Sequence, residues 1–277
     1  MTSRTNLEKT RILSDVWSSR QMIRRLAVND FRTRYAGSYM GIIWAFVQPC
    51  ITILLYWFVF EKGLKAGRQV MGNGEVPFIL FLISGLVPWI FFADALPNGT
   101  GSLLSYNYLV KKVMFKVSIL PVVRVLASVF VHAFFVAVTI IIFAAYGYPP
   151  DWYTLQVIYY SFGTFLLALG LSYLTAAVVV FFRDLKEIIN IVLQIMVWVT
   201  PIMWNLETTV TSGALKWIFR LNPMYYIVSG YRDALIAKVW FWQKPLLTLW
   251  FWAFTIAMMW IGTTVFKKMR NTFADEL

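Results

Sequence analysis

The sequence predicts an all-α, polytopic membrane protein with six transmembrane helices, an N-terminal amphipathic interface helix and extracellular re-entrant helices. Hydrophobic residues make up 60% of the 277 positions, and the mean hydropathy is +0.67. A chain of this composition could not hide its apolar surface from water in a globular fold. Six windows also lack any Asp, Glu, Lys or Arg. A membrane helix needs about 20 such residues, and only a helix satisfies the backbone of so long a segment in lipid.

The charge-free windows predict the spans in order. The second window is short, and the fourth is long enough to tilt or project from the bilayer. We expect residues 1–37 to form a cytoplasmic interface segment and residues 38–277 to form one transmembrane domain. Its six spans are predicted at about 38–60, 76–96, 120–146, 154–182, 187–204 and 245–267.

The distribution of Lys and Arg predicts the orientation. If the N-terminus is inside, the inner segments carry most of the 25 basic residues, as the positive-inside rule requires. We therefore expect a multi-pass protein of the cell membrane with both termini in the cytoplasm. The net charge of +12 then reflects topology and attraction to anionic lipids, and we expect no nucleic-acid partner.

The segment before the first span has the pattern of a helix lying in the membrane interface. Its polar side carries Ser14, Ser18, Gln21, Arg25, Asn29 and Arg32, and its apolar side carries Ile12, Val16, Ile23, Ala27 and Phe31. This pattern suits a helix with one face in the lipid boundary. A solvated lead-in helix is the alternative. Gly37 and Gly41 permit a sharp turn into the first span.

Three connecting segments differ in character. The loop "EKGLKAGRQVMGNGEVP" is a glycine-rich outer turn, whereas the inner loop 105–118 mixes apolar residues with Lys111, Lys112 and Lys116. The inner loop fits either a helix on the membrane surface or a docking helix for a cytoplasmic partner. Residues 205–238 are too polar to cross the membrane and too apolar for a free loop, so we expect re-entrant or surface helices there.

Residues for catalysis or metal binding are missing from the sequence pattern. His132 is the only histidine, and no carboxylate pair or second ligand lies near it in the sequence, so we expect it to pack between helices and predict no metal site. Asp94, placed at the outer end of the second span, and Arg124 are the charges at the membrane edges. The spans carry almost no charge, which argues against coupling to an ion gradient.

Aromatic and amide side chains in the spans are candidates for a path through the membrane. Most aromatic residues in such spans pack against lipid or other helices. Sugar rings also stack on aromatic faces, and their hydroxyl groups need polar partners. The candidate path residues are Trp44, Gln48, Tyr56, Gln194, Trp198 and Trp204. The chain has the features of a passive conduit whose energy source lies elsewhere.

Five sequence pieces, spread over nearly the whole chain, resemble the permeases of type-2 ABC exporters that move lipid-linked polysaccharides. They are "RYAGSYMGIIWAFVQP", "SGLVPWIFF", "FFRDLKEI", "TPIMW" and "NPMYYIVSGYRDAL". The stretches "LLYWFVFEKGLKAGR" and "GEVPFILFLISGLVPW" are most similar to the teichoic acid translocation permeases of Gram-positive bacteria. Permeases for O-antigen and capsular polysaccharide are the next most similar.

This resemblance implies a homodimer bound to two copies of a cytoplasmic ABC ATPase. ATP and magnesium would bind to that partner, so the chain itself would hold no cofactor and no catalytic residue. The first and fifth spans would line the path for a polymer carried on undecaprenyl diphosphate. The loop 105–118 would be the coupling helix, although relatives often have a Phe-Pro pair where this chain has Phe115 and Lys116.

Two further sets of candidate residues follow. For coupling we predict Tyr108, Lys112, Val113, Met114 and Phe115 as contacts with the ATPase. For the lipid diphosphate we predict Arg24, Arg25, Arg32 and Arg34, with Arg32 and Arg34 foremost, because arginine offers paired donors to phosphate oxygens. Topology and lipid anchoring are the alternative role of these arginines. A membrane-bound polymer-modifying enzyme and a scaffold are the alternative functions of the chain.

Overall fold

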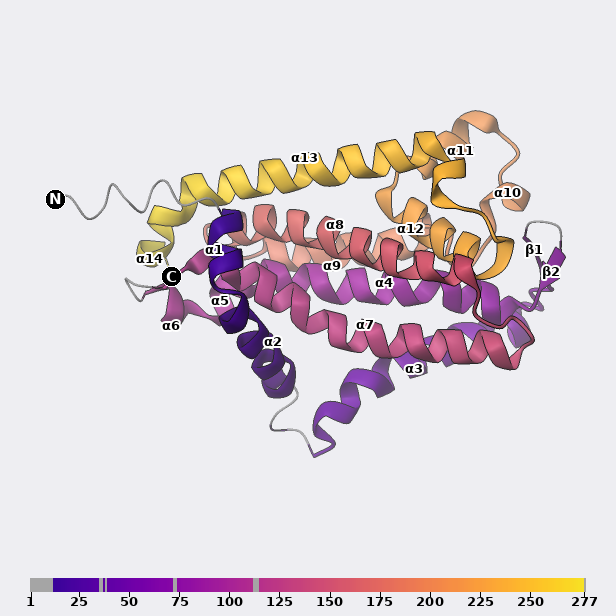
Figure 1. The fold of residues 1–277 in the computed structure, drawn as a ribbon, viewed down its shortest axis with the longest axis horizontal. Coiled ribbons are helices and arrows are strands. Elements are labelled where there is room, and N and C mark those ends of the chain that lie inside the picture. The colour runs from indigo at the N-terminus through magenta and orange to yellow at the C-terminus, as the bar shows by residue number, and fades with distance from the viewer. Residues whose placement is uncertain (1–11, 35–36, 38, 72–73, 112–114, 277) are drawn as a thin grey trace.

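The computed structural model describes residues 12–34, 37, 39–71, 74–111 and 115–276, and these residues are almost entirely helical (Figure 1). The long helices are α3 (Trp44–Trp57), α4 (Phe78–Thr100), α7 (Leu120–Ala145), α8 (Gln156–Val179), α9 (Leu185–Val199) and α13 (Pro245–Met269). The other α-helices are α1 (Ile12–Ser18), α2 (Arg20–Arg34), α5 (Ser102–Ser105), α6 (Asn107–Val110), α10 (Leu206–Thr209), α11 (Gly213–Arg220), α12 (Pro223–Arg232) and α14 (Phe273–Glu276).

Turns of other helix types extend or connect these helices. They are η1 (Gly41–Ile43), η2 (Phe58–Gly63), η3 (Val117–Ile119), η4 (Trp152–Leu155), η5 (Asp233–Ala237), η6 (Phe241–Gln243) and η7 (Arg270–Thr272). A short antiparallel pair of strands, β1 (Gln69–Met71) and β2 (Gly74–Val76), lies within the predicted outer turn. The pattern of this loop did not predict these strands.

Within the described part of the chain, five helical segments are long and apolar enough to cross a membrane. They are Gly41–Gly63, Phe78–Thr100, Val117–Ala145, Trp152–Val179 and Pro245–Glu276. The predicted fifth span contains α9, which has 15 residues and is therefore about 22 Å long, shorter than the roughly 30 Å of a hydrocarbon core. Pro201 follows Thr200, whose backbone is extended, because a residue before proline avoids the helical conformation. The predicted fifth span, and with it the total of six, stays a prediction.

The core of the bundle is built around α4. This helix contacts α7, α8 and α12 and also touches α3 and α9. Of the apolar window in α4, 78% is buried, compared with 6% for the segment containing α3. Helix α13 packs closely on α8, where a Cβ atom at Gly262 would lie 2.4 Å from the carbonyl oxygen of Gly170. Helix α3 is therefore the least packed of the long helices.

The two ends of the bundle carry different elements (Figure 1). Helices α1 and α14, the first and last of the described chain, lie at one end together with α5 and α6, and we call it the termini end. The strands β1 and β2 and the helix α10 lie at the opposite end, which we call the hairpin end. We define the coupling segment as residues 105–118; its first described residues, in α5 and α6, thus lie at the termini end.

The segment 205–238 forms the three short helices α10, α11 and α12 and the turn η5. Asn205 and Asn222 cap α10 and α12, since their side-chain oxygens accept hydrogen bonds from the backbone N–H groups of Glu207 and Met224. Pro223 occupies the first turn of α12, where its missing N–H costs nothing. Helix α12 is buried against α4 and α8. Entry of these helices into the membrane stays a prediction.

Candidate functional site

Basic side chains line a groove along one face of α2. Arg24, Arg25 and Arg32 surround a hollow of about 570 Å³ that Gln21, Val28 and Asn29 complete. These positions recur at intervals of three and four residues, so they share one face of the helix. All three arginines are exposed. Their guanidinium groups are free to donate paired hydrogen bonds to an anion such as a phosphate. We call this surface the basic groove.

Arg34, the fourth predicted arginine, lies away from this groove. Its Nη2 atom is 3.1 Å from Asp30 Oδ2, and its Nη1 atom is 3.1 Å from Asp94 Oδ2. The side chain is 14% exposed. The structure therefore brings together three of the four predicted headgroup residues and places Arg34 in an ion-pair cluster with α4.

Asp30 is the centre of that cluster. Its side chain is 4% exposed, and its Oδ1 atom lies 3.0 Å from Arg124 Nη1 of α7. The hydroxyl of Tyr106 donates to the same oxygen at 2.7 Å, and the Arg124 guanidinium lies over the Tyr106 ring at 5.1 Å. Burial, together with the bond to Asp30, raises the pKa of the Tyr106 hydroxyl well above its usual range, so this group keeps its proton and acts as a donor.

Asp94 was predicted at the outer end of the second span, but it pairs with α2, the interface helix that the same topology places inside, so the two predictions conflict. Its carboxylate pairs with Arg34 of α2 and accepts hydrogen bonds from Ser128 and Asn98. The conflict has a simple cause. The second span runs back from the hairpin end, so its last turns lie at the termini end. The cluster also explains how an acid near an apolar span is tolerated, because a buried charge needs a paired, hydrogen-bonded partner.

The sequence pattern contained a signal for this cluster that we did not use. Ile23, Ala27, Asp30 and Arg34 follow one another at steps of four, three and four. This spacing puts Asp30 on the apolar face of the interface helix, where an unpaired carboxylate would be costly. Asp15, which comes earlier in the chain on the same face, is also buried.

The predicted coupling residues fall partly outside the described part of the chain. Lys112, Val113 and Met114 lie outside the described residues. Tyr108 is 57% exposed and available to a partner. Phe115 is half-buried and packs against the core of the bundle itself, so only part of its side chain is available to a partner.

Most of the predicted path residues converge on two hollows. A cavity of about 490 Å³ lies between α3, α4, α7 and α9, and Gln48, Tyr56 and Gln194 line it. A second, more open hollow of about 630 Å³ on the surface of α9 is lined by Gln194, Trp198 and Trp204. The rings of Tyr56 and Trp198 lie 6.4 Å apart, so the two hollows adjoin. Trp44 is exposed at the start of α3 and is not among the residues that line either hollow.

His132 occupies a packing position, as the sequence suggested. Its Nε2 atom lies 3.0 Å from Ser161 Oγ and 3.1 Å from the Tyr231 hydroxyl, and its ring stacks on Phe91. These contacts join α7, α8, α12 and α4. Among the described residues, no group of three His, Cys, Asp or Glu side chains could hold a metal ion.

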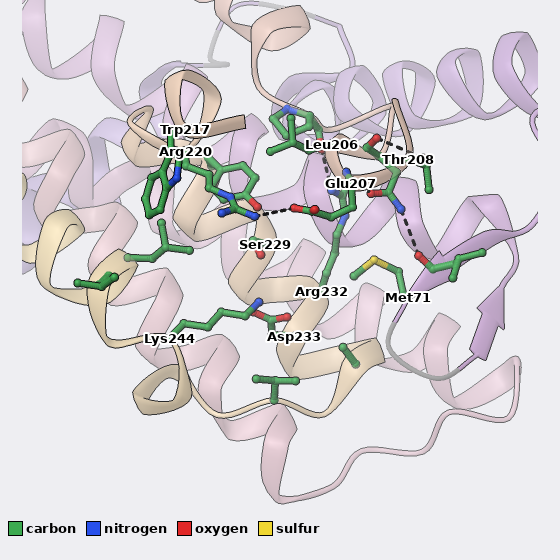
Figure 2. A pocket seen from close by; sticks show the side chains of 18 of the residues that line it. Met71, Leu206, Glu207, Thr208, Trp217, Arg220, Ser229, Arg232, Asp233 and Lys244 are labelled. Carbon is green, nitrogen blue, oxygen red and sulfur yellow. Dashed lines mark hydrogen bonds and ion pairs between the residues drawn. The ribbon is translucent and has the colours of Figure 1, made fainter. Parts of the chain in front are cut away.

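A further cavity of about 770 Å³ at the hairpin end was not predicted (Figure 2). On its wall, Glu207 accepts hydrogen bonds from Arg220 and Lys216, each at 2.8 Å. The bond from Lys216 holds the pKa of the Glu207 carboxyl below its usual range. Lys244 pairs with the buried Asp233 deeper in the cavity. These ion pairs connect the short helices α10 and α11 and join the start of α13 to η5.

The fold and these hollows define a polytopic membrane protein with a polar cavity between its helices and a basic groove on the helix that precedes them. The chain belongs to the ABC-2 type transporter family, whose model matches residues 21–236. The resemblance inferred from the sequence pieces is thereby confirmed. The matched region begins in α2 and includes the basic groove, the cavity between α3, α4, α7 and α9, and the coupling segment.

Named relatives are similar over most of the chain. An O-antigen export system permease protein RfbA of Myxococcus xanthus is 26% identical over 267 residues, covering 96% of this chain and 99% of the relative. An RfbA of Klebsiella pneumoniae is 25% identical over 252 residues, covering 90% and 92%. The polysialic acid transport protein KpsM of Escherichia coli is 21% identical over 220 residues, covering 77% and 81%. Two of these relatives are thus named as O-antigen export permeases and the third as a polysialic acid transport protein.

Proposed function

We propose that this permease moves a polysaccharide linked to undecaprenyl diphosphate across the cytoplasmic membrane, with both termini on the cytoplasmic side. The basic groove carries this proposal. It presents three exposed arginines on α2, the helix that precedes the first span, and we expect this helix to lie at the depth of the lipid phosphates. A diphosphate brings about two negative charges, which paired guanidinium donors match better than single ammonium groups do.

The polymer would follow the cavity and the hollow on α9. Tyr56, Trp198 and Trp204 offer ring faces for sugars, and Gln48 and Gln194 offer amide groups for their hydroxyls. Trp44 would meet the polymer where α3 begins. The mixture of ring faces and uncharged polar groups suits a sliding polymer, because no single contact there is strong enough to hold it.

The energy would come from a cytoplasmic ABC ATPase present in two copies, which binds the ATP and magnesium. We further propose that the permease is a homodimer. Exposed apolar side chains on α3 and α9, among them Ile51, Leu54, Ile191 and Ile195, support a second copy packing against these helices, as the family resemblance implies.

Two cargoes are candidates. The stretches around the first outer loop favour wall teichoic acid, whereas the relatives named above export O-antigen or polysialic acid. The deciding experiment reconstitutes the permease with its ATPase in nanodiscs and adds each lipid-linked polymer separately. We expect one polymer class to stimulate ATP hydrolysis. Hydrolysis that responds to neither class would contradict the proposed function.

The coupling segment is expected to dock into the ATPase. Replacing Met114 and Phe115 together by Asp puts two charges into an apolar contact, where a buried anchor typically contributes about 2 kcal/mol or more. The ATPase should then fail to co-purify or fail to respond to polymer. Leu215→Asp, at an exposed apolar position on α11, is the control and should leave the complex intact. A double variant that still assembles and exports would make the segment a simple surface helix.

A further inference from the structure

The coupling segment contains helical turns that are too short to be stable by themselves. Helix α6 has four residues and η3 has three, and helices this short are unstable without tertiary contacts. The orientation of the segment must therefore come from side chains that tie it to the rest of the subunit. At both of its ends, buried acids of the N-terminal helices make such contacts.

The first contact lies before α6. Tyr106 donates its hydroxyl hydrogen to Asp30 Oδ1 at 2.7 Å, and Arg124 holds the same oxygen at 3.0 Å. Since Asp30 is 4% exposed, water does not compete effectively for its carboxylate. Hydrogen bonds to charged groups are stronger than neutral ones. The start of the segment is therefore fixed to α2.

The second contact lies at the end of the segment, at Lys116 and Ser118. Ser118 donates to Asp15 Oδ2 at 2.9 Å. Lys116 Nζ lies 3.4 Å from Asp15 Oδ1 and donates to Ser18 Oγ at 2.8 Å. Asp15 is 2% exposed. The end of the segment is therefore fixed to α1.

The two acids lie on consecutive helices that are joined by a single residue, Ser19. The backbone hydrogen bonds from Ser19 to Asp15 and from Ile23 to Ser19, at 3.0 and 2.9 Å, carry the helical pattern from α1 into α2. The buried face of these two helices holds Asp15 and Asp30, and an exposed face of α2 carries the basic groove. A displacement of the coupling segment must shift the groove as well, unless one of these buried carboxylates loses its partners, which is costly.

We propose that Asp15 and Asp30 are positioning residues that fix the coupling segment to α1 and α2, so that movement of the ATPase is transmitted to the basic groove. This inference rests on the proposed function, because it requires the segment to contact the ATPase. It assigns to the interface helices a mechanical role in addition to lying in the membrane surface.

The test uses the full permease co-expressed with its ATPase and placed in nanodiscs. The variants are Asp30→Asn, Asp15→Asn and Tyr106→Phe, and the matched control is Asp151→Asn. Asp151 also pairs with a lysine, Lys238, at 2.9 Å, but it lies at the hairpin end before η4. Two quantities are measured: the amount of ATPase that co-purifies, and the ratio of ATP hydrolysis with and without lipid-linked polymer.

We expect both Asp variants to keep the ATPase bound while this ratio falls to nearly one, with Tyr106→Phe in between and Asp151→Asn unchanged. A second measurement reports the mechanics directly. Spin labels on cysteines at Trp17 and Asn107, introduced into a Cys50→Ala background, should give a narrow distance distribution that broadens in Asp30→Asn.

Full polymer stimulation in both Asp variants, or an unchanged distance distribution, would overturn the inference. If Asp30→Asn fails to insert, Tyr106→Phe decides in its place, since it removes one hydroxyl group only, and full stimulation there has the same meaning. Failure of the proposed function gives a different result, namely an unaltered permease whose ATP hydrolysis responds to no lipid-linked polymer.

Discussion

Replacing all three arginines of the basic groove by lysine separates headgroup recognition from simple charge. Arg24, Arg25 and Arg32 are exposed and line one hollow, so lysine fits at each position without disturbing the core. The positive charge is kept, but the paired donors are lost. A hydrogen bond to a charged group contributes about 1.5–3 kcal/mol. The loss of two such bonds, about 3 kcal/mol, corresponds to roughly a hundredfold weaker binding.

The assay is ATP hydrolysis by the reconstituted complex as a function of lipid-linked polymer concentration. We expect the half-stimulating concentration of polymer to rise by about a hundredfold in the triple variant. Arg20→Lys is the matched control, because Arg20 lies on the same helix and contacts Trp17 outside the groove. A triple variant within about twofold of the wild type would refute the reasoning and leave these arginines as topology and lipid-anchoring residues.

Three other predictions concern packing, orientation and pH. Gly262→Ala should lower the thermal midpoint of the purified permease by several degrees, because the new Cβ atom would lie 2.4 Å from a carbonyl oxygen of α8 and overpacking costs about 1–3 kcal/mol. Cysteines at Lys65 and Ser212 should react with an impermeant label in intact cells, and a cysteine at Asn271 should not. The lowered pKa of Glu207 means that its ion pairs stabilise α10 and α11 above the usual pKa of Glu and are lost as the pH falls through the lowered pKa. The protection of the amides of residues 206–220 against exchange, corrected for the intrinsic pH dependence of exchange, should therefore be high at neutral pH and fall as the pH drops through the lowered pKa of Glu207.

Each of these predictions has a sharp contrary outcome. A Cβ atom at Gly74 would meet nothing within 4 Å, so Gly74→Ala is the control for Gly262→Ala. A thermal midpoint that falls equally in both variants would contradict the packing argument. Labelling of a cysteine at residue 271 in sealed cells would show that the predicted orientation is wrong. Glu207→Gln should show fast exchange at neutral pH, and slow exchange there would show that the ion pairs do not hold these helices.

The periodicity and charge-free windows predicted most of the long helices, because a span in lipid leaves a signal along the chain itself. Helix α9 was the exception. Its apolar window continues to Leu206, but Pro201 ends the helix at Val199, and a hydropathy window does not register backbone geometry.

The candidate site was predictable only in part. Arg24, Arg25 and Arg32 were recognised because their spacing on one helix is local information. The separate position of Arg34 depends on Asp94, which is 60 residues away along the chain. No pattern within the interface helix contains that partner. The hairpin-end cavity depends in the same way on contacts between segments that are distant in the sequence.

The weak packing of α3 has a consequence for how the protein is made. A helix in lipid satisfies its own backbone hydrogen bonds, so α3 is stable in the bilayer as soon as it leaves the insertion machinery. With 6% of its span buried, it gains little from the helices that follow. We therefore expect α3 to enter the membrane first and dock against α4 last. A ribosome-stalled chain that ends shortly after Gly63 should already be anchored as an integral membrane protein.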